Sequence, residues 1–215
     1  MLKDKHNVTQ KQKSPGFFAF LSYWKVSSKH FKLLVAGLLM FTLFNSSDAF
    51  LLLSIKSKGF SDTYMIGIYI FYNLIYALLS FPIGILADKF GLARTLIFGL
   101  LVFAVVYSLM GFAILLWQFI VIFGFYALYA ASTEGISKAL ISNIAKKNNT
   151  ATAIGFYTSF ASIFTMLASS LAGLLWYTLG MKTMFLISGA GVLCVAVYLA
   201  VVQRFVLNKI SSDNT

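Results

Sequence analysis

The sequence is poor in cysteine and in histidine, and both shortages exclude classes of function. Cys194 is the only cysteine among 215 residues, so the chain can form neither an internal disulfide nor a site built from several thiolates. His6 and His30 are the only histidines, and both precede the first long apolar run. A haem-binding membrane cytochrome would lack its axial ligands, and an intramembrane serine protease would lack its Ser–His pair.

The sequence also lacks the short motifs of hydrolases. It contains no G-x-S-x-G, no H-E-x-x-H and no pair of acidic residues with the spacing of metal ligands. We therefore expect that the protein is not an enzyme and that it needs neither a cofactor nor a metal site.

Charged residues are scarce, at 11% of the chain, whereas 60% of the residues are hydrophobic and the mean hydropathy is +0.86. Soluble domains have about 25% charged and about 45–50% apolar residues, so this composition indicates a membrane protein. Only six acidic residues oppose 17 basic ones, and seven of the basic residues precede residue 33. Bases beside an apolar run are typical of membrane topology and of contact with anionic lipid, so we expect no nucleic acid partner.

Six apolar segments are each long enough to cross a bilayer, which takes about 20 residues. Polar or mixed residues occupy positions 1–30, so the N-terminus does not resemble a signal peptide. We predict an all-α membrane protein with a leader over residues 1–30, a membrane part over 31–205 and a tail over 206–215. The six transmembrane helices are expected at residues 31–53, 64–85, 95–115, 117–141, 153–177 and 183–203.

The connections between these segments alternate in charge, which predicts their sides of the membrane. The leader, the second and fourth connections and the tail are basic, whereas the other connections contain only Lys56, Lys58 and Lys182. Basic connections stay on the cytoplasmic side. We therefore predict that both termini are cytoplasmic, and the even number of crossings agrees with their lying on the same side.

The leader contains the aromatic stretch Phe17-Phe18-Ala19-Phe20-Leu21-Ser22-Tyr23-Trp24-Lys25, with further lysines after it. Such a stretch is typical of a helix that lies at the level of the lipid headgroups. The alternative is a flexible tether whose lysines only set the topology. The sequence leaves both interpretations open.

Three ionisable side chains fall inside the predicted spans, where each costs about 2.5–3.5 kcal/mol unless it has a partner or a wet cavity. Asp48 is in the first span, with Asn45 on the same helical face. Glu134 and Lys138 are four residues apart in the fourth span, in the order that favours an ion pair. We predict that these four side chains line a cavity or take part in coupling. The alternative for Lys138 is that it only neutralises Glu134 or extends toward the inner face.

Two further stripes of residues have helical spacing. Tyr72 and Asn73 lie well inside the second span, and we predict that they line the same cavity; the alternative is that its tyrosines are interfacial anchors. Small residues recur in the fifth span, and such a stripe allows close packing or sliding of helices. We predict packing of this kind at Ala151, Gly155, Ser159, Ser169 and Gly173, and also at Gly84.

The second connection reads Gly84-Ile85-Leu86-Ala87-Asp88-Lys89-Phe90-Gly91-Leu92-Ala93-Arg94, and we expect a short polar turn there. It resembles the loop signature of the major facilitator superfamily of secondary transporters, G-x-L-A-D-[RK]-x-G-R-[RK]-[RK], although Leu92 and Ala93 stand where the family often has bases. The segments around Asn45–Leu53 and Thr133–Leu140 resemble the seventh and tenth helices of bacterial members. The resemblance covers roughly residues 15–205.

This resemblance implies half of a twelve-helix transporter, built as two inverted three-helix repeats. The substrate cavity of such a fold lies between the halves, and the first helix of each triplet lines it, which would place Asp48 and Glu134 there. All three buried charges indeed fall in the first and fourth spans. The resemblance also implies that Asp88, with its motif neighbours, stabilises one conformation by facing nearby bases and the N-terminus of the fifth span. These neighbours are Gly84, Lys89, Gly91 and Arg94.

We therefore expect transport of a small solute by alternating access in the bacterial inner membrane. The expected partners are the bilayer, the solute and either a second six-helix half or a second copy of the chain. Ion coupling through Asp48 or Glu134 is a further hypothesis. The alternatives are a membrane scaffold or regulator that does not transport, and a non-functional remnant of a split transporter gene.

Overall fold

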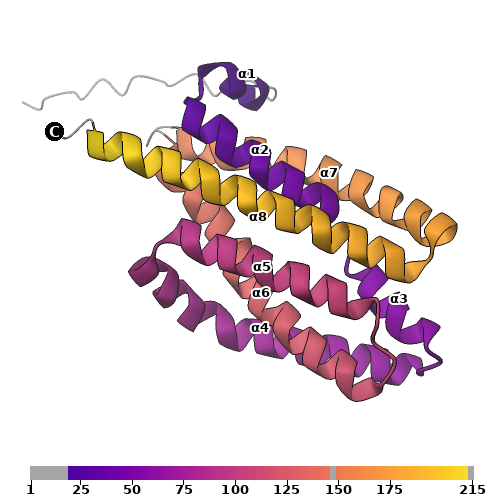
Figure 1. Cartoon of the computed structure of the whole chain (residues 1–215). Helices are drawn as coiled ribbons and strands as arrows, with labels where there is room; N and C mark the ends of the chain where they lie inside the picture. The colour runs from indigo at the N-terminus through magenta and orange to yellow at the C-terminus, as the bar shows by residue number, and fades with distance from the viewer. Residues whose placement is uncertain (1–18, 146–148, 213–215) are drawn as a thin grey trace, which may run out of the picture.

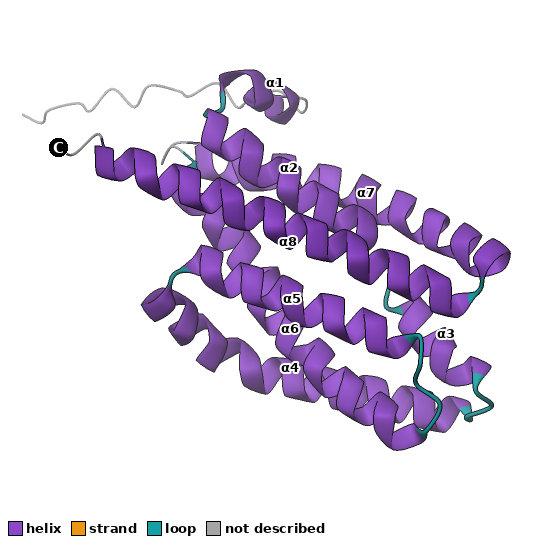
Figure 2. Cartoon of the chain, in the orientation of Figure 1, coloured by secondary structure: helices purple, strands orange, loops and turns teal. Residues whose placement is uncertain are grey.

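The computed structural model describes residues 19–145 and 149–212, and these residues form helices and no β-strand (Figures 1 and 2). Helices suit a bilayer because each satisfies most of its backbone N–H and C=O groups internally. In chain order the helices are α1 Ala19–Val26, α2 Lys29–Phe44, α3 Ala49–Ser57, α4 Asp62–Phe90, α5 Leu92–Met110, α6 Leu116–Ile144, α7 Thr150–Leu179 and α8 Met181–Ser212.

Six elements of the described chain are long and apolar enough to cross a membrane, as the sequence predicts. Helices α4 to α8 supply five of them, and α2 together with α3 supplies the first, over Lys29–Ser57. Most of these elements extend beyond the predicted segments. α5 instead ends at Met110, before the predicted end at residue 115, because the chain turns at Gly111 and Phe112.

The first crossing is not one continuous helix, which corrects the sequence prediction. Residues Asn45–Asp48 separate α2 from α3 within the membrane-spanning length, and we call this segment the break. Asn, Ser and Asp side chains compete with the backbone for hydrogen bonds and so disfavour helix interiors. The Ser47 hydroxyl accepts the Ala49 N–H at 3.3 Å, and the Ser47 N–H is donated to the Ser169 hydroxyl of α7 at 3.2 Å.

The connection between α4 and α5 is the single residue Gly91, and not a turn over residues 84–94 as expected. α4 continues to Phe90 and α5 begins at Leu92. Gly91 has a φ of 98°, which residues with a Cβ rarely adopt, and this conformation lets the chain reverse in one step. Its N–H is donated to the Ala87 carbonyl at 2.9 Å.

The same turn recurs between α7 and α8, at the equivalent point of the second three-helix unit. Gly180 has a φ of 84°, and its N–H is donated to the Trp176 carbonyl at 3.0 Å. The carbonyls of Gly91 and Gly180 each accept the N–H of the residue four positions on, both at 3.2 Å. Helix contacts also correspond, because α4 and α5 pack on α6 as α7 and α8 pack on α2. This correspondence agrees with two three-helix repeats.

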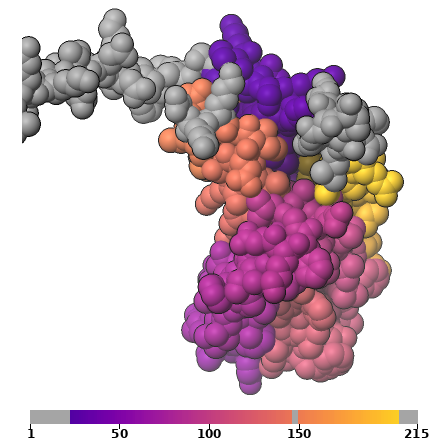
Figure 3. Space-filling view, turned by 90° about the vertical axis from the view of Figure 1, so that its left-hand side faces the viewer, coloured from indigo at the N-terminus to yellow at the C-terminus, as the bar shows by residue number. Residues whose placement is uncertain are grey.

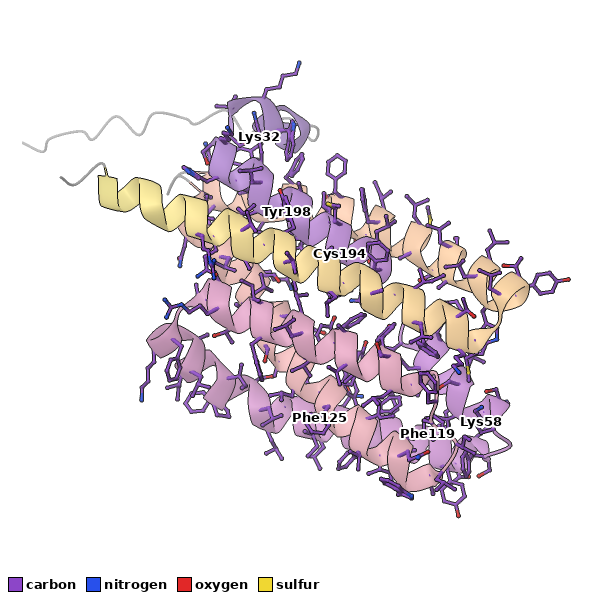
Figure 4. The ribbon with its side chains drawn as sticks, viewed as in Figure 1. Lys32, Lys58, Phe119, Phe125, Cys194 and Tyr198 are labelled. Carbon is purple, nitrogen blue, oxygen red and sulfur yellow. The ribbon has the colours of Figure 1, made fainter. Side chains whose placement is uncertain are left out.

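The crossing helices form two layers in Figure 1. Helices α2, α7 and α8 lie in one layer and α4, α5 and α6 in the other, and contact between α5 and α8 joins them. Large aromatic side chains such as Tyr107, Phe103 and Phe119 are completely buried in the core. Phe125 of α6, labelled with Phe119 in Figure 4, is 54% exposed. An apolar outer surface of this kind is suited to lipid tails.

Close packing of the helices depends on glycines of α5 and α8. A Cβ on Gly99 of α5 would lie 2.7 Å from Thr133 Cγ2 and 2.8 Å from Ser132 Cβ, both on α6. A Cβ on Gly189 of α8 would lie 3.0 Å from the Ala104 carbonyl oxygen of α5. These distances are shorter than ordinary van der Waals contact, so glycine is what lets the helices approach.

The predicted stripe of small residues on α7 is at a helix contact only in its second part. Ser169 binds the break, and a Cβ on Gly173 would lie 3.7 Å from Phe50 of α3. In the described part of the chain, a Cβ on Gly155 or on Gly84 would meet no atom within 4 Å. Ala151 and Ser159 are exposed as well, so the described residues place no helix against the first part of the stripe.

α1 packs against the bundle, which supports a helix and not a flexible tether in this part of the leader. Trp24 stacks on Phe156 of α7 with ring centroids 5.5 Å apart, and Tyr23 contacts the edge of Phe31 of α2 at 5.1 Å. A position at the lipid headgroups stays a prediction. Residues 1–18 of the leader lie outside the described chain, and so do Lys146 and Lys147, on which the topology prediction partly rests.

The two ends of the bundle carry different elements. α1, the α4–α5 turn and the C-terminal part of α8 gather at one end, which we call the α1 end, and α3 lies at the other, the α3 end (Figure 1). Lys32 and Lys58 mark these two ends in Figure 4. Figure 3 views the molecule from the α1 end, with the magenta α4–α5 segment facing the viewer. The described chain thus enters and leaves the bundle at the same end.

Candidate functional site

Asp48 and Asn45 are held at the break by two tyrosines of α6. The Tyr126 hydroxyl is donated to Asp48 Oδ1 at 2.6 Å. The Asn45 Nδ2 is donated to the Tyr129 hydroxyl at 3.0 Å, while the buried Asn45 Oδ1 has no hydrogen-bond partner among the described residues. One helix therefore positions both polar side chains of the interrupted crossing.

These tyrosines belong to a cluster of rings between α4, α5 and α6. The ring centroids of Tyr126 and Tyr129 are 5.1 Å apart, and Tyr72 of α4 lies 5.1 Å from Tyr126. Tyr107 of α5 lies 6.4 Å from Tyr126, and its hydroxyl is 3.5 Å from that of Ser46 in the break. Packed rings have little freedom, so their hydroxyls meet the break in a defined geometry.

Glu134 and Lys138 lie one turn apart on α6, and both are exposed. The ion pair that their spacing favours does not form within the described chain, where the ion pair present joins Lys56 and Asp62 at 3.0 Å. Glu134 instead accepts a hydrogen bond from the Tyr76 hydroxyl of α4 at 2.9 Å. The geometry therefore gives no support to the interpretation that Lys138 only neutralises Glu134.

Both charges stand at a polar cavity of about 330 Å³ between α2, α6 and α7. Small-molecule sites have volumes of about 300–1,000 Å³, so a small solute fits. Asn45 lines the same cavity and connects it with the break. The other residues of the lining mostly carry hydroxyl groups: Phe41, Thr42, Tyr129, Thr133, Ser137, Tyr157, Thr158, Ala161, Ser162 and Thr165.

Several of these hydroxyls donate to the backbone of their own helix. Thr133 and Ser137 donate at 2.9 and 2.7 Å to the carbonyls four residues earlier, and Thr158 does the same at 3.0 Å. A hydroxyl that donates in this way keeps its lone pairs as acceptors. The cavity wall thus offers one carboxylate, one ammonium group and a set of acceptor oxygens.

Tyr72 and Asn73, predicted from the sequence to line the cavity, are not part of its wall. Tyr72 is 6% exposed and belongs to the tyrosine cluster. Asn73 is exposed, and its Nδ2 is donated to the Tyr69 carbonyl of the same helix at 2.8 Å. Consecutive residues of a helix lie about 100° apart, so only one of this pair can face the core. Tyr76, one turn beyond Tyr72, is the residue of α4 that reaches the site, through Glu134.

The segment that resembles the family's loop signature lies at the α1 end, beside a second cavity of about 780 Å³. Asp88, Lys89, Gly91 and Arg94 line this cavity. Asp88 is exposed, and it lines this cavity and a smaller one with residues of other helices but with none of α7. The helix that begins beside Asp88 is α5, and the predicted approach of Asp88 to the N-terminus of the fifth span stays a prediction.

Sequence reasoning did not single out Tyr126, Tyr129 or Thr133, although a signal was present. With Ser137, these residues recur at intervals of three, four and four, which places a polar stripe on one face of an apolar helix. In the structure this stripe runs from the break, through the tyrosine cluster, to the cavity.

The crossing elements differ in how far the rest of the described chain encloses them. In the most apolar stretches of α4 and α7, 11% of the residues are buried, against 39–61% for the other four elements. Both helices nevertheless carry exposed polar side chains, including Asn73 of α4 and Ser159, Ser162 and Thr165 of α7. Polar groups at membrane depth face protein or water and not lipid tails.

The sequence is similar to that of known proteins. The family model described as Major Facilitator Superfamily matches residues 33–212. An uncharacterised MFS-type transporter of Methanocaldococcus jannaschii is 33% identical over 156 residues. That match covers 69% of this chain but 39% of the relative, so the chain matches less than half of the relative's length. With six crossings, two similar triplets and a match over most of its length, the chain belongs to the major facilitator superfamily.

Proposed function

We propose that the protein moves a small polar solute across the membrane by alternating access, and that the cavity between α2, α6 and α7 receives the solute. The family points to a transporter and not to an enzyme. The main support is that Glu134 and Lys138, both within the crossing helix α6, line the same cavity. Charges at this depth are costly, and a wet cavity that binds a polar solute offsets that cost.

A second six-helix unit is proposed to cover α4 and α7 and to close the cavity. The low enclosure of these two helices and their exposed polar side chains support this. At the α1 end, the exposed Asp88 is proposed to meet this second unit in one of the two conformations.

The protein is proposed to lie in the cell membrane with both termini in the cytoplasm. The basic residues Lys32, Lys89 and Arg94 lie at the α1 end, against Lys56 and Lys58 at the α3 end. An excess of basic residues near the ends of the spans marks the cytoplasmic side. The α1 end is thus assigned to the cytoplasm.

Solute binding is tested on the purified chain in detergent. Amino acids, sugars, organic anions and organic cations are added in turn, and the midpoint of thermal unfolding is measured. A ligand that binds the folded state raises this midpoint. At least one class is expected to do so. The two cavity variants, Glu134→Gln and Lys138→Met, are each expected to remove the effect. Asp62→Asn changes an acid outside the cavity and should respond like the unchanged protein.

If no class of solute raises the midpoint, or if both cavity variants respond fully, the cavity is not the solute site. That result would favour the alternative of a scaffold or regulator that does not transport. A solute that does bind is then tested for uptake into vesicles that contain the protein.

The second unit is tested by cross-linking in membranes, in a Cys194→Ser background. A cysteine at Ser159 of α7 is expected to give a product larger than the single chain, because this face is proposed to be covered by protein. Val105→Cys, on an exposed position of α5, should give none. The mass of the product separates a second copy of the chain from a different partner, and equal behaviour of both variants would contradict the proposed interface.

A further inference from the structure

We infer that the break is a binding site for a monovalent metal cation, with Na⁺ as the ion, held between Asp48 and Asn45. This deepens the proposed function and rests on it, because the cation would be the coupling ion of the same cavity. The site is distinct from the solute-facing charges, since Glu134 and Lys138 lie on α6, beyond the two tyrosines that hold the break.

The break supplies backbone oxygens that lack donors. The Asn45 N–H is donated to the Phe41 and Thr42 carbonyls, which ends α2. Within the described chain, no N–H or hydroxyl is donated to the carbonyl oxygens of residues 43–46. Backbone groups left unpaired at membrane depth are costly unless protein, water or an ion satisfies them. Interrupted helices of other transporters use such carbonyls to coordinate Na⁺.

Asn45 supplies a side-chain oxygen that also lacks a donor. Its Nδ2 is donated to the Tyr129 hydroxyl at 3.0 Å, and this contact turns its Oδ1 away from that hydroxyl. The Oδ1 is buried and has no hydrogen-bond partner in the described chain. A buried amide oxygen without a donor is destabilising, and a bound cation would offset that cost.

Asp48 supplies the negative charge. The Tyr126 hydroxyl is donated to its Oδ1 at 2.6 Å, which leaves its other carboxylate oxygen free of this contact. The first N–H groups of α3 do not bind this carboxylate. The Ala49 N–H is donated to the Ser47 hydroxyl and the Phe50 N–H to the Ser47 carbonyl. Asp48 also forms no ion pair with a basic side chain of the described residues. Its charge is thus left for a mobile cation.

The proposed ligands all belong to the four-residue break or the end of α2, and they suit a single positive charge. Tyr126 and Tyr129, which hold Asp48 and Asn45, have ring centroids only 5.1 Å apart. One carboxylate with neutral oxygens balances one monovalent ion, whereas protein sites for Ca²⁺ draw on several oxygens that include more than one carboxylate. No cluster of His, Cys, Asp and Glu that suits a transition metal occurs in the described chain.

The position of Asn45 would couple the cation to the solute. Asn45 is both a proposed ligand and part of the cavity wall. The break also connects with α7, because the Ser47 N–H is donated to Ser169. A cation that orders the break would therefore act on the cavity wall and on a helix that faces the proposed second unit.

Equilibrium dialysis with ²²Na⁺ tests the site on the purified chain in detergent. About one Na⁺ per chain is expected, displaced by unlabelled Na⁺ but not by choline. NaCl should also raise the thermal unfolding midpoint above that in choline chloride of the same ionic strength. KCl measures size selectivity, and CaCl₂ is expected not to displace the bound ²²Na⁺.

Asp48→Asn keeps the shape of the side chain and removes its charge. It should abolish both ²²Na⁺ binding and the Na⁺-dependent rise in the thermal unfolding midpoint. Asn45→Leu should weaken binding at least tenfold. Asp62→Asn, which removes an exposed acid at the α3 end, should leave both readouts unchanged. Because the dialysis on the unchanged chain needs no variant, poor folding of Asp48→Asn would not leave the question open.

The inference is overturned if the unchanged chain binds no ²²Na⁺, or if Asp48→Asn binds as much. If the Asn45 amide were turned so that its Nδ2, and not its Oδ1, faced the site, no Na⁺ would bind. Failure of the cation site is distinct from failure of the proposed function. If solutes still stabilise the protein without Na⁺, the proposed solute cavity is supported and the cation site is not. If Na⁺ binds but no solute has an effect, only the cation site is supported.

Discussion

At the scale of single residues, tyrosine hydroxyls distinguish the two acidic side chains of the site. Asp48 accepts a hydrogen bond of 2.6 Å from Tyr126, whose ring is 3% exposed. Glu134 accepts one of 2.9 Å from Tyr76 and remains exposed. The first contact is enclosed by aromatic rings, while the second borders the cavity. Asp48 is therefore held against the core at the break, whereas Glu134 borders the polar cavity.

Tyr126→Phe removes the donor to Asp48 while keeping the ring. We expect a loss of about 1–2 kcal/mol in the free energy of unfolding, because a hydrogen bond to a charged group contributes about 1.5–3 kcal/mol and somewhat less in membranes. Unfolding in detergent, followed by circular dichroism, measures this. Tyr177→Phe is the matched control, since Tyr177 is 89% exposed. Equal stability of the two variants would contradict the assigned contact.

Single residues also show how far the sequence could predict the site. Asp48, Asn45, Glu134 and Lys138 stood out because polar side chains are expensive in a span, and the last two line the cavity with Asn45. Tyr72 instead packs on Tyr126 and is not in the wall of this cavity, because its helix face depends on how α4 packs against α6. The same periodicity describes a cavity wall and a core position.

At the scale of elements, the interrupted first crossing and the one-residue turns determine where the site lies. The break depends on partners distant in sequence, namely Ser169 of α7 and the tyrosines of α6. Hydropathy predicts a span at this point but does not register a gap of four residues. The turn at Gly91 was expected to be longer, because Asp88 and Lys89 read as loop residues although they are compatible with a helix end.

Gly91→Ala tests the single-residue turn. An alanine at a φ of 98° is strained, and we expect a loss of about 1–3 kcal/mol in the free energy of unfolding. Gly84→Ala is the matched control, because that position is helical and open. It should be neutral or stabilise the protein by up to about 1 kcal/mol. Chemical unfolding of both variants measures these changes. A Gly91→Ala variant as stable as the unchanged protein would contradict the assigned turn.

Gly99→Ala tests the close approach of α5 and α6. The added Cβ would overlap Thr133 and Ser132, and overpacking of this kind costs about 1–3 kcal/mol. Gly155→Ala, in open space on α7, should not destabilise the isolated chain. The measurement is the thermal unfolding midpoint in detergent. A larger loss for Gly155→Ala than for Gly99→Ala would mean that the glycine contacts are assigned to the wrong helices.

At the scale of the whole molecule, the two triplets build a bundle in which α4 and α7 are the least buried crossing elements. The equivalent turns at Gly91 and Gly180 and the matching helix contacts relate the triplets. Composition and hydropathy were sufficient to predict six crossings, because span length and charge scarcity are properties of the whole chain. The low enclosure of α4 and α7 depends on helix packing, which hydropathy does not report.

The orientation of the bundle is tested by labelling cysteines in intact cells with a membrane-impermeant thiol reagent, in a Cys194→Ser background. Lys58→Cys at the α3 end is expected to react, because this end is assigned to the outside. Lys89→Cys at the α1 end is expected to react only after the membrane is opened. The reverse pattern would invert the orientation, and labelling of both in intact cells would contradict six complete crossings.

Alternating access predicts that the cavity opens to each side of the membrane in turn, and Ser162→Cys in the Cys194→Ser background tests this most directly. Ser162 lines the cavity on α7 and is exposed there. An impermeant thiol reagent is applied to right-side-out and to inside-out vesicles, and the labelled fraction is measured. We predict labelling from both sides. Labelling from one side only, or from neither, would contradict the account.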